Sequence, residues 1–302
     1  MNISVVVPCY NAARFIGACL ESVANQTLPP CEVIVIDDGS TDDSADVVAA
    51  APLPVRVLQT PRRGGAGARN AGIAAAAGEW VAFLDADDVW YANHLERAAE
   101  VIGRHEPVGY INHYDRIAAS GGEAQVRRSP FDSIVVGTGL DAYVEHFARY
   151  GHFVGMSACL VETRRARAVG GLCEDQKRRH DIEFWLRVVG GERWVFDPLA
   201  TSAYRKHSPG GLSADAADAA YYGFQAFLRH RDEAGDLARF DAVLRERARS
   251  AVSRGFAAGS VESRERAYGS AFDYLSPRHK RLFGLCRRFP AVFGLFRALK
   301  LV

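Results

Sequence analysis

Short apolar runs alternate with helical patterns over the first hundred residues. Continuous β-branched and aromatic runs of strand length occur at residues 3–7, 33–36, 55–58 and 80–84. Between them, apolar residues recur at helical spacing at 15–23, and alanine-rich stretches follow at 45–50 and 66–77. Strands that are apolar throughout, each followed by a helix, indicate a mostly parallel sheet with helices on both faces. The pattern predicts a doubly wound α/β fold, in which ligands bind at the carboxyl ends of the strands.

The pattern is less regular after residue 105. It predicts strands at 108–114 and 158–161, helices at 140–150 and 182–189, and a closing pair of strands at 194–196 and 201–205. From about residue 214 the chain is predicted to be helical and is rich in Arg, Ala and Phe.

Composition narrows the class of protein. Of the 302 residues, 48% are hydrophobic and 24% charged, which is typical of a globular protein, and the net charge of +1 argues against a nucleic-acid partner. The six cysteines form no C-x-x-C pair and no zinc-ligand spacing, so we expect neither a disulfide framework nor a zinc site. We see no signal peptide and no apolar run of about 20 residues, and therefore expect a cytoplasmic protein.

The last thirty residues differ from the rest in charge. No acidic residue follows Asp273, while Arg and Lys alternate with Leu and Phe up to Lys300. This mixture is typical of an interfacial helix that contacts anionic lipid at the inner face of the cell membrane. It fits equally well a terminal helix that packs its Phe/Leu face on the domain and leaves Arg in solvent.

Polar residues follow the first two strands. Pro8, Tyr10 and Asn11 come after the first, where an aromatic ring could stack on a base and an amide could bind its edge. Asp37 and Asp38 come after the second, and two carboxylates there could accept hydrogen bonds from a pyrimidine or a ribose. Each group also fits a simple turn followed by a helix cap.

A glycine-rich segment, residues 62–72, follows the third strand. It is not a dinucleotide fingerprint, because Asn70 occupies the position of the third required glycine, and this disfavours a dehydrogenase. A glycine-rich helix start with Arg69 beside it still suits a phosphate or a nucleotide edge.

Asp85, Asp87 and Asp88 follow the fourth strand. Carboxylates that share the end of a buried strand repel one another unless a cation compensates them, and such oxygen ligands suit Mg²⁺ or Mn²⁺ carrying a diphosphate. A D-x-D sequence also occurs by chance and at helix caps.

Two later segments carry further candidates. Asp181 opens the amphipathic helix, where the helix dipole would keep it ionised and able to accept a proton. Arg205 or Lys206, at the end of the last predicted strand, could neutralise a leaving diphosphate, and His207 could bind a metal or a phosphate.

Taken together and in this order, the motifs VVVPCYN, VIDDGSTD, ARNAG and FLDADD resemble those of the family 2 glycosyltransferases over about residues 1–213. The resemblance implies a GT-A fold and inverting transfer of a sugar from a nucleotide diphosphate-sugar, with UDP favoured. It implies a base pocket of Pro8, Tyr10, Asn11, Asp37 and Asp38. Arg69, Asp85 and Arg205 would lie along the rest of the donor, with Asp87, Asp88 and His207 at the metal and Asp181 as general base. The family usually reads Glu-Asp where this chain reads His180-Asp181, so the Asp matches the family's pattern and the Glu does not.

The resemblance also implies how the chain divides. We expect a glycosyltransferase domain at 1–213, with a nucleotide-binding half at 1–105 and an acceptor-binding half at 106–213, followed by a helical extension at 214–302. The acceptor would be a saccharide or a lipid-linked saccharide in polysaccharide or glycoconjugate biosynthesis. Two alternatives remain: a sugar-1-phosphate nucleotidyltransferase, and a non-catalytic module that binds nucleotide-sugars.

Overall fold

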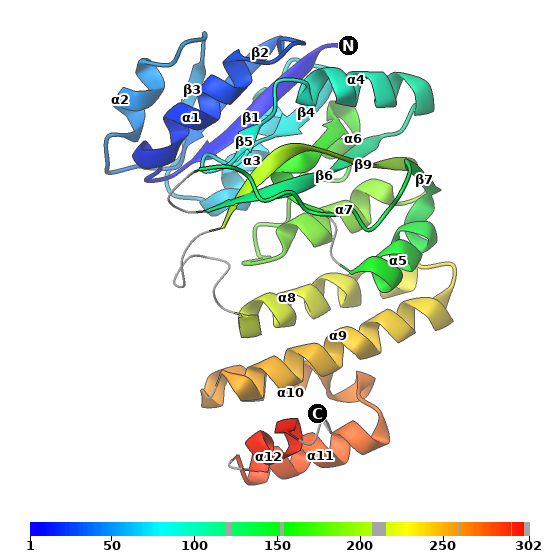
Figure 1. The fold of residues 1–302 in the computed structure, drawn as a ribbon. Helices are drawn as coiled ribbons and strands as arrows, with labels where there is room; N and C mark the ends of the chain where they lie inside the picture. Colours follow the sequence, from blue (N-terminus) through cyan, green and yellow to red (C-terminus); the bar gives the residue numbers. More distant parts are fainter. Residues whose placement is uncertain (119–121, 152–153, 207–215, 259, 291, 299–302) are drawn as a thin grey trace.

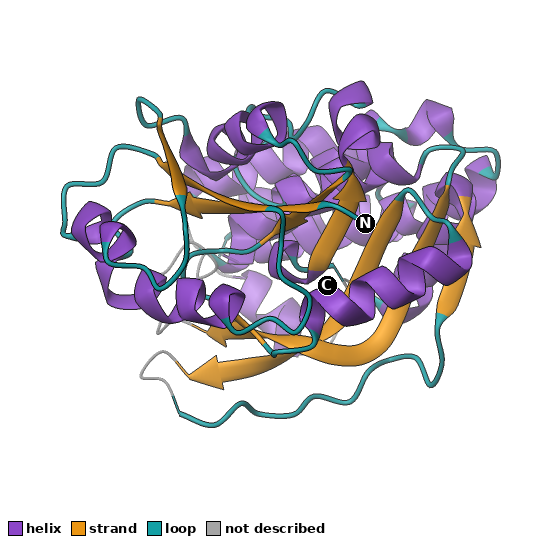
Figure 2. Ribbon diagram, turned by 90° about the horizontal axis from the view of Figure 1, so that it is seen from above, coloured by secondary structure: helices purple, strands orange, loops and turns teal. Residues whose placement is uncertain are grey.

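The computed structural model describes residues 1–118, 122–151, 154–206, 216–258, 260–290 and 292–298. Its centre is a nine-stranded sheet of order β3-β2-β1-β4-β8-β6-β9-β5, with β7 paired to β9 (Figures 1 and 2). The strands are β1 (Ile3–Cys9), β2 (Glu32–Asp37), β3 (Arg56–Gln59), β4 (Trp80–Phe83), β5 (Val89–Trp90), β6 (Gly109–Ala118), β7 (Val135–Thr138), β8 (Cys159–Glu162) and β9 (Arg193–Lys206).

The first half of the sheet is parallel and the second half mixed. Strands β1, β2, β3 and β4 pair in parallel, β8 runs antiparallel to both β4 and β6, and β6 pairs with β9 in parallel. The carboxyl ends of β1 to β4 and of β6 and β9 therefore meet along one edge of the sheet, which is where ligands bind in α/β folds.

Helices cover both faces of the sheet because its strands are apolar on both sides. The helices of this part are α1 (Ala13–Ala24), α2 (Ser44–Ala49), α3 (Gly64–Ala75), α4 (His94–His105), α5 (Gly139–Tyr150), α6 (Thr163–Ala168) and α7 (His180–Val189). Val5 and Val7 of β1 share a core with α1 and α4, while Val6 faces the core that contains α3, α5 and α7. At Gly72 the helix α3 comes so close to the sheet that an added Cβ would lie 2.3 Å from the Val6 side chain.

One predicted element differs in the structure. The pair of strands expected at 194–196 and 201–205 is a single strand, β9, which runs through Asp197 and Pro198. The Asp197 carboxylate is fully buried and accepts hydrogen bonds from Arg97 and from the hydroxyl of Tyr110. These bonds compensate the buried charge of Asp197, so the strand continues through it. The effect of this segment on the sheet is a pair of register shifts between β6 and β9.

The helical region forms successive layers on one side of the sheet domain (Figure 1). Its helices are α8 (Ala216–Arg229), α9 (Leu237–Ala257), α10 (Val261–Ala271), α11 (Pro277–Arg288) and α12 (Val292–Ala298). Phe227 of α8 lies 4.7 Å, centroid to centroid, from Phe147 of α5, so the region shares the core of the sheet domain. Within the described residues, no helix combines the length and apolar character that crossing a bilayer requires.

The basic terminal segment has one buried and one exposed side. Phe283 and Cys286 of α11 are fully buried, and Phe283 stacks on Phe256 of α9 with 5.7 Å between ring centroids. Leu285 and Phe289 are 42% and 50% exposed. One side of α11 therefore packs on the domain, as one of the two interpretations expects. A contact of its exposed side with a membrane stays a prediction.

Candidate functional site

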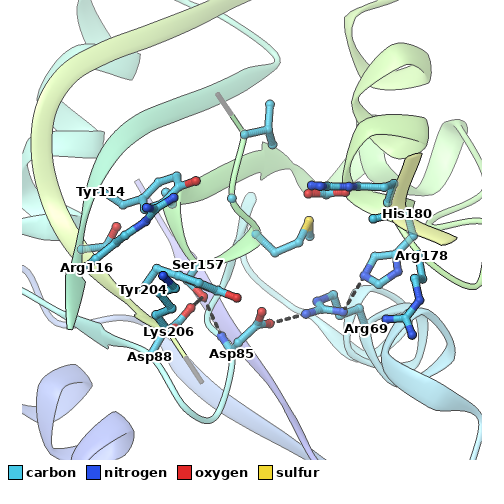
Figure 3. Close-up of a pocket in the computed structure, with 18 of the residues that line it drawn as sticks. Arg69, Asp85, Asp88, Tyr114, Arg116, Ser157, Arg178, His180, Tyr204 and Lys206 are labelled. Carbon is cyan, nitrogen blue, oxygen red and sulfur yellow. Dashed lines mark hydrogen bonds and ion pairs between the residues drawn. The ribbon is translucent and has the colours of Figure 1, made fainter. Parts of the chain in front are cut away.

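A cavity of about 700 Å³ opens at the carboxyl edge of the sheet (Figure 3). Its floor contains Asp85 and Asp88, which follow β4, and Ser157, which precedes β8. One side is formed by the ends of β6 and β9, and the other by the segment that leads into α7. Segments far apart in the sequence thus meet at the position that the strand pattern predicts.

The acidic cluster on the floor can hold a divalent cation. Asp85, Asp87 and Asp88 each offer a carboxylate oxygen, and these oxygens lie within 4.8 Å of one another. Burial raises the pKa of Asp88 well above its usual range, and the neighbouring charges of Asp87 and Asp85 raise it further. A cation would offset both effects, and an all-oxygen donor set suits Mg²⁺ or Mn²⁺.

Ser157 joins two of these carboxylates. Its hydroxyl donates to Asp88 at 2.5 Å and accepts a hydrogen bond from the backbone N–H of Asp85 at 3.0 Å. The backbone N–H of Arg205 donates to the other oxygen of Asp88 at 2.7 Å. Asp88 is therefore fixed in one orientation by β9 and by the segment before β8.

Arg69 links the cluster to the start of α7. The guanidinium is 5% exposed, forms an ion pair with Asp85, and donates to the carbonyl of Gly65 at 2.9 Å. It also lies 3.2 Å from Nε2 of His180 (Figure 3). Because a guanidinium can only donate, Nε2 must accept, so His180 is neutral with its proton on Nδ1. Burial, together with the positive charge of Arg69, lowers the pKa of His180 in agreement with this assignment.

Asp181 lines the same cavity from the first turn of α7. Arg179, just before the helix, has φ of 58°, so the chain turns sharply into α7 there. An Asp181 oxygen accepts from the backbone N–H of Ile182 at 2.9 Å. The structure brings the proposed base and the acidic cluster to one cavity, as their positions in the sequence predict.

The predicted base-binding residues form a separate group at the ends of β1 and β2. Asp38 is 3% exposed and accepts hydrogen bonds from the Thr60 hydroxyl and from the backbone N–H groups of Arg63 and Gly64. Asp37 accepts from the N–H of Ser40. Asp38 thus anchors the start of α3, and a contact of either carboxylate with a base stays a prediction.

Tyr10 and Asn11 lie beside these carboxylates. Tyr10 is 41% exposed, and the guanidinium of Arg62 covers one face of its ring at 3.2 Å from the centroid. The side-chain oxygen of Asn11 accepts from the N–H of Thr41 at 2.8 Å. Pro8 is half-buried in β1, opposite Ile36. An exposed aromatic face next to polar loops is a suitable platform for a base.

The basic loop after β9 differs in detail from the prediction. The Arg205 guanidinium donates to the carbonyls of Asp87 and Ala118 and lies 5.1 Å from the centre of the Phe15 ring. It therefore stabilises the backbone of the loop that carries Asp87. Its neighbour Lys206 lines the cavity instead. His207 lies outside the described residues.

Several cavity residues were not predicted from the sequence. They are Tyr114, Arg116, Arg127, Ser157, Lys177, Arg178 and Tyr204. Apart from Tyr204, which directly precedes Arg205 in the basic segment, none belongs to a local motif. The parallel pairing of β6 with β9 brings Tyr114, Arg116 and Tyr204 together. Strand alternation could have distinguished Lys206 from Arg205, because successive side chains point to opposite faces.

Comparison with known proteins agrees with this geometry. Residues 4–157, just over half of the chain, match the family described as Glycosyl transferase family 2. The fold is of GT-A type, with a helical extension at its C-terminus. The chain belongs to glycosyltransferase family 2.

The matched relatives are similar over limited segments. An uncharacterized glycosyltransferase of Nostoc sp. is 45% identical over 121 residues, 39% of this chain and 38% of the relative. The glycosyltransferase GlyG of Streptococcus pneumoniae is 37% identical over 116 residues, 37% of this chain and 38% of that protein. The chain thus spans less than half the length of these curated relatives.

Solved structures show the same fold over nearly the whole chain. Residues 1–349 of S. aureus TarS, in complex with UDP-GlcNAc, superpose with a TM-score of 0.73 at 21% identity, covering all of this chain and 88% of that one. The mannosyltransferase PcManGT of Pyrobaculum calidifontis, with GDP-Man and Mn²⁺, gives 0.61 at 18% identity, covering 98% and 86%.

Proposed function

We propose that the protein transfers a sugar from a nucleotide diphosphate-sugar, with UDP favoured, to an acceptor hydroxyl with inversion at the anomeric carbon. The observation that carries the proposal is the meeting of Asp181 with Asp85 and Asp88 in one cavity. The nucleotide would extend from the Tyr10 platform to the acidic cluster. Asp181 would take the proton from the acceptor hydroxyl as it attacks the face of the sugar opposite the leaving diphosphate.

The charged residues support this reaction in two ways. Asp87, Asp88 and Asp85 would hold Mn²⁺ or Mg²⁺, which, when bound, offsets the charge that develops on the departing diphosphate. Arg69 holds Asp85 in place through the ion pair and through its bond to Gly65. These two contacts hold the Arg69 guanidinium and the Asp85 carboxylate in fixed positions before substrate arrives.

Replacement of the proposed base tests the mechanism. Asp181→Asn should keep UDP binding and lose transfer by about 10²-fold or more, because the amide cannot accept the proton. Release of UDP from UDP-sugars, measured with a panel of saccharide acceptors, gives the activity, and calorimetry gives the binding. Exposed Asp175, in the loop before α7, provides the matched control Asp175→Asn. Near-normal transfer by Asp181→Asn would exclude it as the base, and release of pyrophosphate from a nucleoside triphosphate would favour a nucleotidyltransferase.

We also propose that the exposed side of α11 contacts anionic lipid at the inner face of the cell membrane, where a lipid-linked acceptor for polysaccharide or glycoconjugate assembly would lie. Leu285 and Phe289 are exposed there. Arg281 and Arg288 lie beside them and are exposed as well. Apolar side chains flanked by cations are typical of surfaces that bind anionic membranes.

A further inference from the structure

Positive charge exceeds negative charge in the cavity. Besides Arg69, the cationic side chains that line it are Arg116, Arg127, Lys177, Arg178, Arg179 and Lys206. The carboxylates on its lining are Asp85, Asp88 and Asp181. Arg69 pairs with Asp85, and Arg178 lies 3.7 Å from Asp218.

Three cations on the β6 and β9 side have no ion pair with any carboxylate among the residues that the structure describes: Arg116, Arg127 and Lys206. In the part of the chain that the structure describes, no carboxylate lies within 4 Å of the charged groups of Arg116, Arg127 or Lys206. Arg116 and Lys206 are exposed, and the Arg127 guanidinium lies 5.2 Å from the centre of the Tyr114 ring. Like charges gathered in one cavity repel one another, and this arrangement favours an anionic ligand.

The donor does not account for this excess. A nucleotide diphosphate-sugar carries about two negative charges, and one divalent cation at the acidic cluster offsets them. The donor would also lie on the other side of the cluster, because Tyr10 and Asp38 follow β1 and β2, whereas Arg116 and Lys206 lie in the last residues of β6 and β9. In the sheet order, β4 with its acidic loop separates these two groups of strands.

We propose that the acceptor is an anion that carries phosphate close to its reacting hydroxyl, and that Arg116, Arg127 and Lys206 bind this phosphate. The inference rests on the proposed function, because it assigns the donor to the ends of β1 and β2, on the other side of the acidic cluster. Tyr114 and Tyr204, whose ring centroids lie 6.1 Å apart, stand beside these cations (Figure 3). They offer aromatic faces to the sugar or polyol that bears the phosphate.

A binding experiment with the donor site filled tests the inference. The protein is saturated with UDP and Mn²⁺ and titrated by calorimetry with glucose 1-phosphate and with glucose. We expect glucose 1-phosphate to bind at least about tenfold more tightly than glucose, and this preference to weaken at high salt. The variants Arg116→Gln and Lys206→Gln, and the double variant Arg116→Gln/Arg127→Gln, should lose the preference while UDP still binds.

Arg128→Gln is the matched control, because Arg128 is adjacent in sequence, its side chain is 91% exposed and it does not line the cavity. Equal binding of glucose 1-phosphate and glucose by the wild-type protein would overturn the inference. It would also be overturned if both single variants and the folded double variant kept the wild-type preference for glucose 1-phosphate. Failure of UDP to bind to the wild-type protein would instead contradict the proposed function, so the two failures are distinguishable in one set of samples.

The source of the phosphate is distinguished by transfer assays. A soluble glycerol phosphate oligomer and an octyl diphosphate-linked glucose are each compared with neutral octyl glucoside. Preference for either anionic acceptor supports the inference and identifies its source as a polyol phosphate or a lipid diphosphate. Preference for the neutral glucoside would overturn it.

Discussion

At the residue scale, the acidic groups of the site were predictable and their supports were not. Asp85 and Asp181 could be found because each follows a recognisable pattern, a buried strand or the start of an amphipathic helix. Ser157 carries no such signal, since it precedes β8 and reaches Asp88 only through the pairing of β4 with β8. A residue such as Ser157, which orients another side chain, is identified from tertiary contacts and not from a local sequence pattern.

Ser157→Ala should weaken metal-dependent nucleotide binding. The substitution leaves the buried Asp88 without its hydroxyl donor, and loss of such a supporting bond typically lowers metal affinity about 10- to 100-fold. We also expect a loss of about 1–3 kcal/mol in the free energy of unfolding. Titration of UDP in the presence of Mn²⁺ and chemical denaturation measure the two effects.

Ser260→Ala serves as the control for the stability loss. Ser260 caps α10 and accepts from the N–H of Ser263, far along the chain from the cavity lining. Its loss should cost about 1 kcal/mol without changing nucleotide binding. If Ser157→Ala bound UDP with Mn²⁺ as tightly as the wild type, the assigned role of Ser157 would be wrong.

At the element scale, α7 connects the site to the helical extension. Its Glu183 is 3% exposed, pairs with Arg187 on the same helix and lies 3.3 Å from Nε2 of His230, just after α8. Burial acts to raise the pKa of Glu183, but hydrogen bonds from His230 and Arg187 outweigh it and lower the pKa to about 2. The helix that carries Asp181 is thus fixed by a buried ion pair that the sequence pattern did not indicate.

This pair predicts a pH dependence of stability. Burial acts to lower the pKa of His230, but hydrogen bonds to Glu183 and Glu233 outweigh it, so the folded-state pKa lies above the usual 6.5. The stabilisation is therefore complete below about pH 6.5 and is lost as the pH rises through the folded-state pKa. Between pH 6.5 and 8 the stability of the wild type relative to His230→Gln should therefore fall. The histidines whose pKa values are lowered act in the opposite direction, equally in both proteins: His94, His113, His180 and His279.

Denaturant unfolding at each pH measures this difference. Burial lowers the pKa of His94 to about 3, so that ring is neutral in the folded protein but partly protonated in the unfolded chain near pH 6.5, and its contribution to stability rises with pH, opposite to that of His230. His94→Gln therefore provides a control with the opposite sign, and its free energy of unfolding should fall relative to that of the wild type between pH 6.5 and 8. An identical slope for His230→Gln and the wild type would show that the pKa of His230 is not raised in the folded protein, which would contradict the assigned pairing with Glu183.

At the scale of the whole molecule, the parallel half of the sheet was predictable and the second half only in part. Strands β1, β2 and β4 are largely apolar and buried, and a loop with its own motif follows each strand from β1 to β4, so local patterns suffice there. Strand β9 pairs with β5, β6 and β7, and its continuity through Asp197 depends on partners about a hundred residues away. The extension was predicted to be helical, while its packing on α5 and α7 was left open.

That packing changes how a membrane role must be tested. Deleting the segment after Asp273 would remove Phe283 as well as the exposed residues, and Phe283 fills the core between α9 and α11. Phe283→Ala should lower the free energy of unfolding by about 3–5 kcal/mol, because it leaves a cavity in a packed core. Phe289→Ala should change it by less than about 0.5 kcal/mol, since that ring is half exposed.

The two substitutions therefore separate the structural role of α11 from a membrane role. Flotation with vesicles that contain anionic phosphatidylserine should be reduced for Leu285→Ala/Phe289→Ala, which keeps the fold, and should weaken with salt because the flanking arginines contribute. Leu237→Ala is the matched control, because Leu237 is 44% exposed at the start of α9 and lies away from the basic segment. Equal flotation of the double variant and the control would contradict the proposed contact of α11 with lipid.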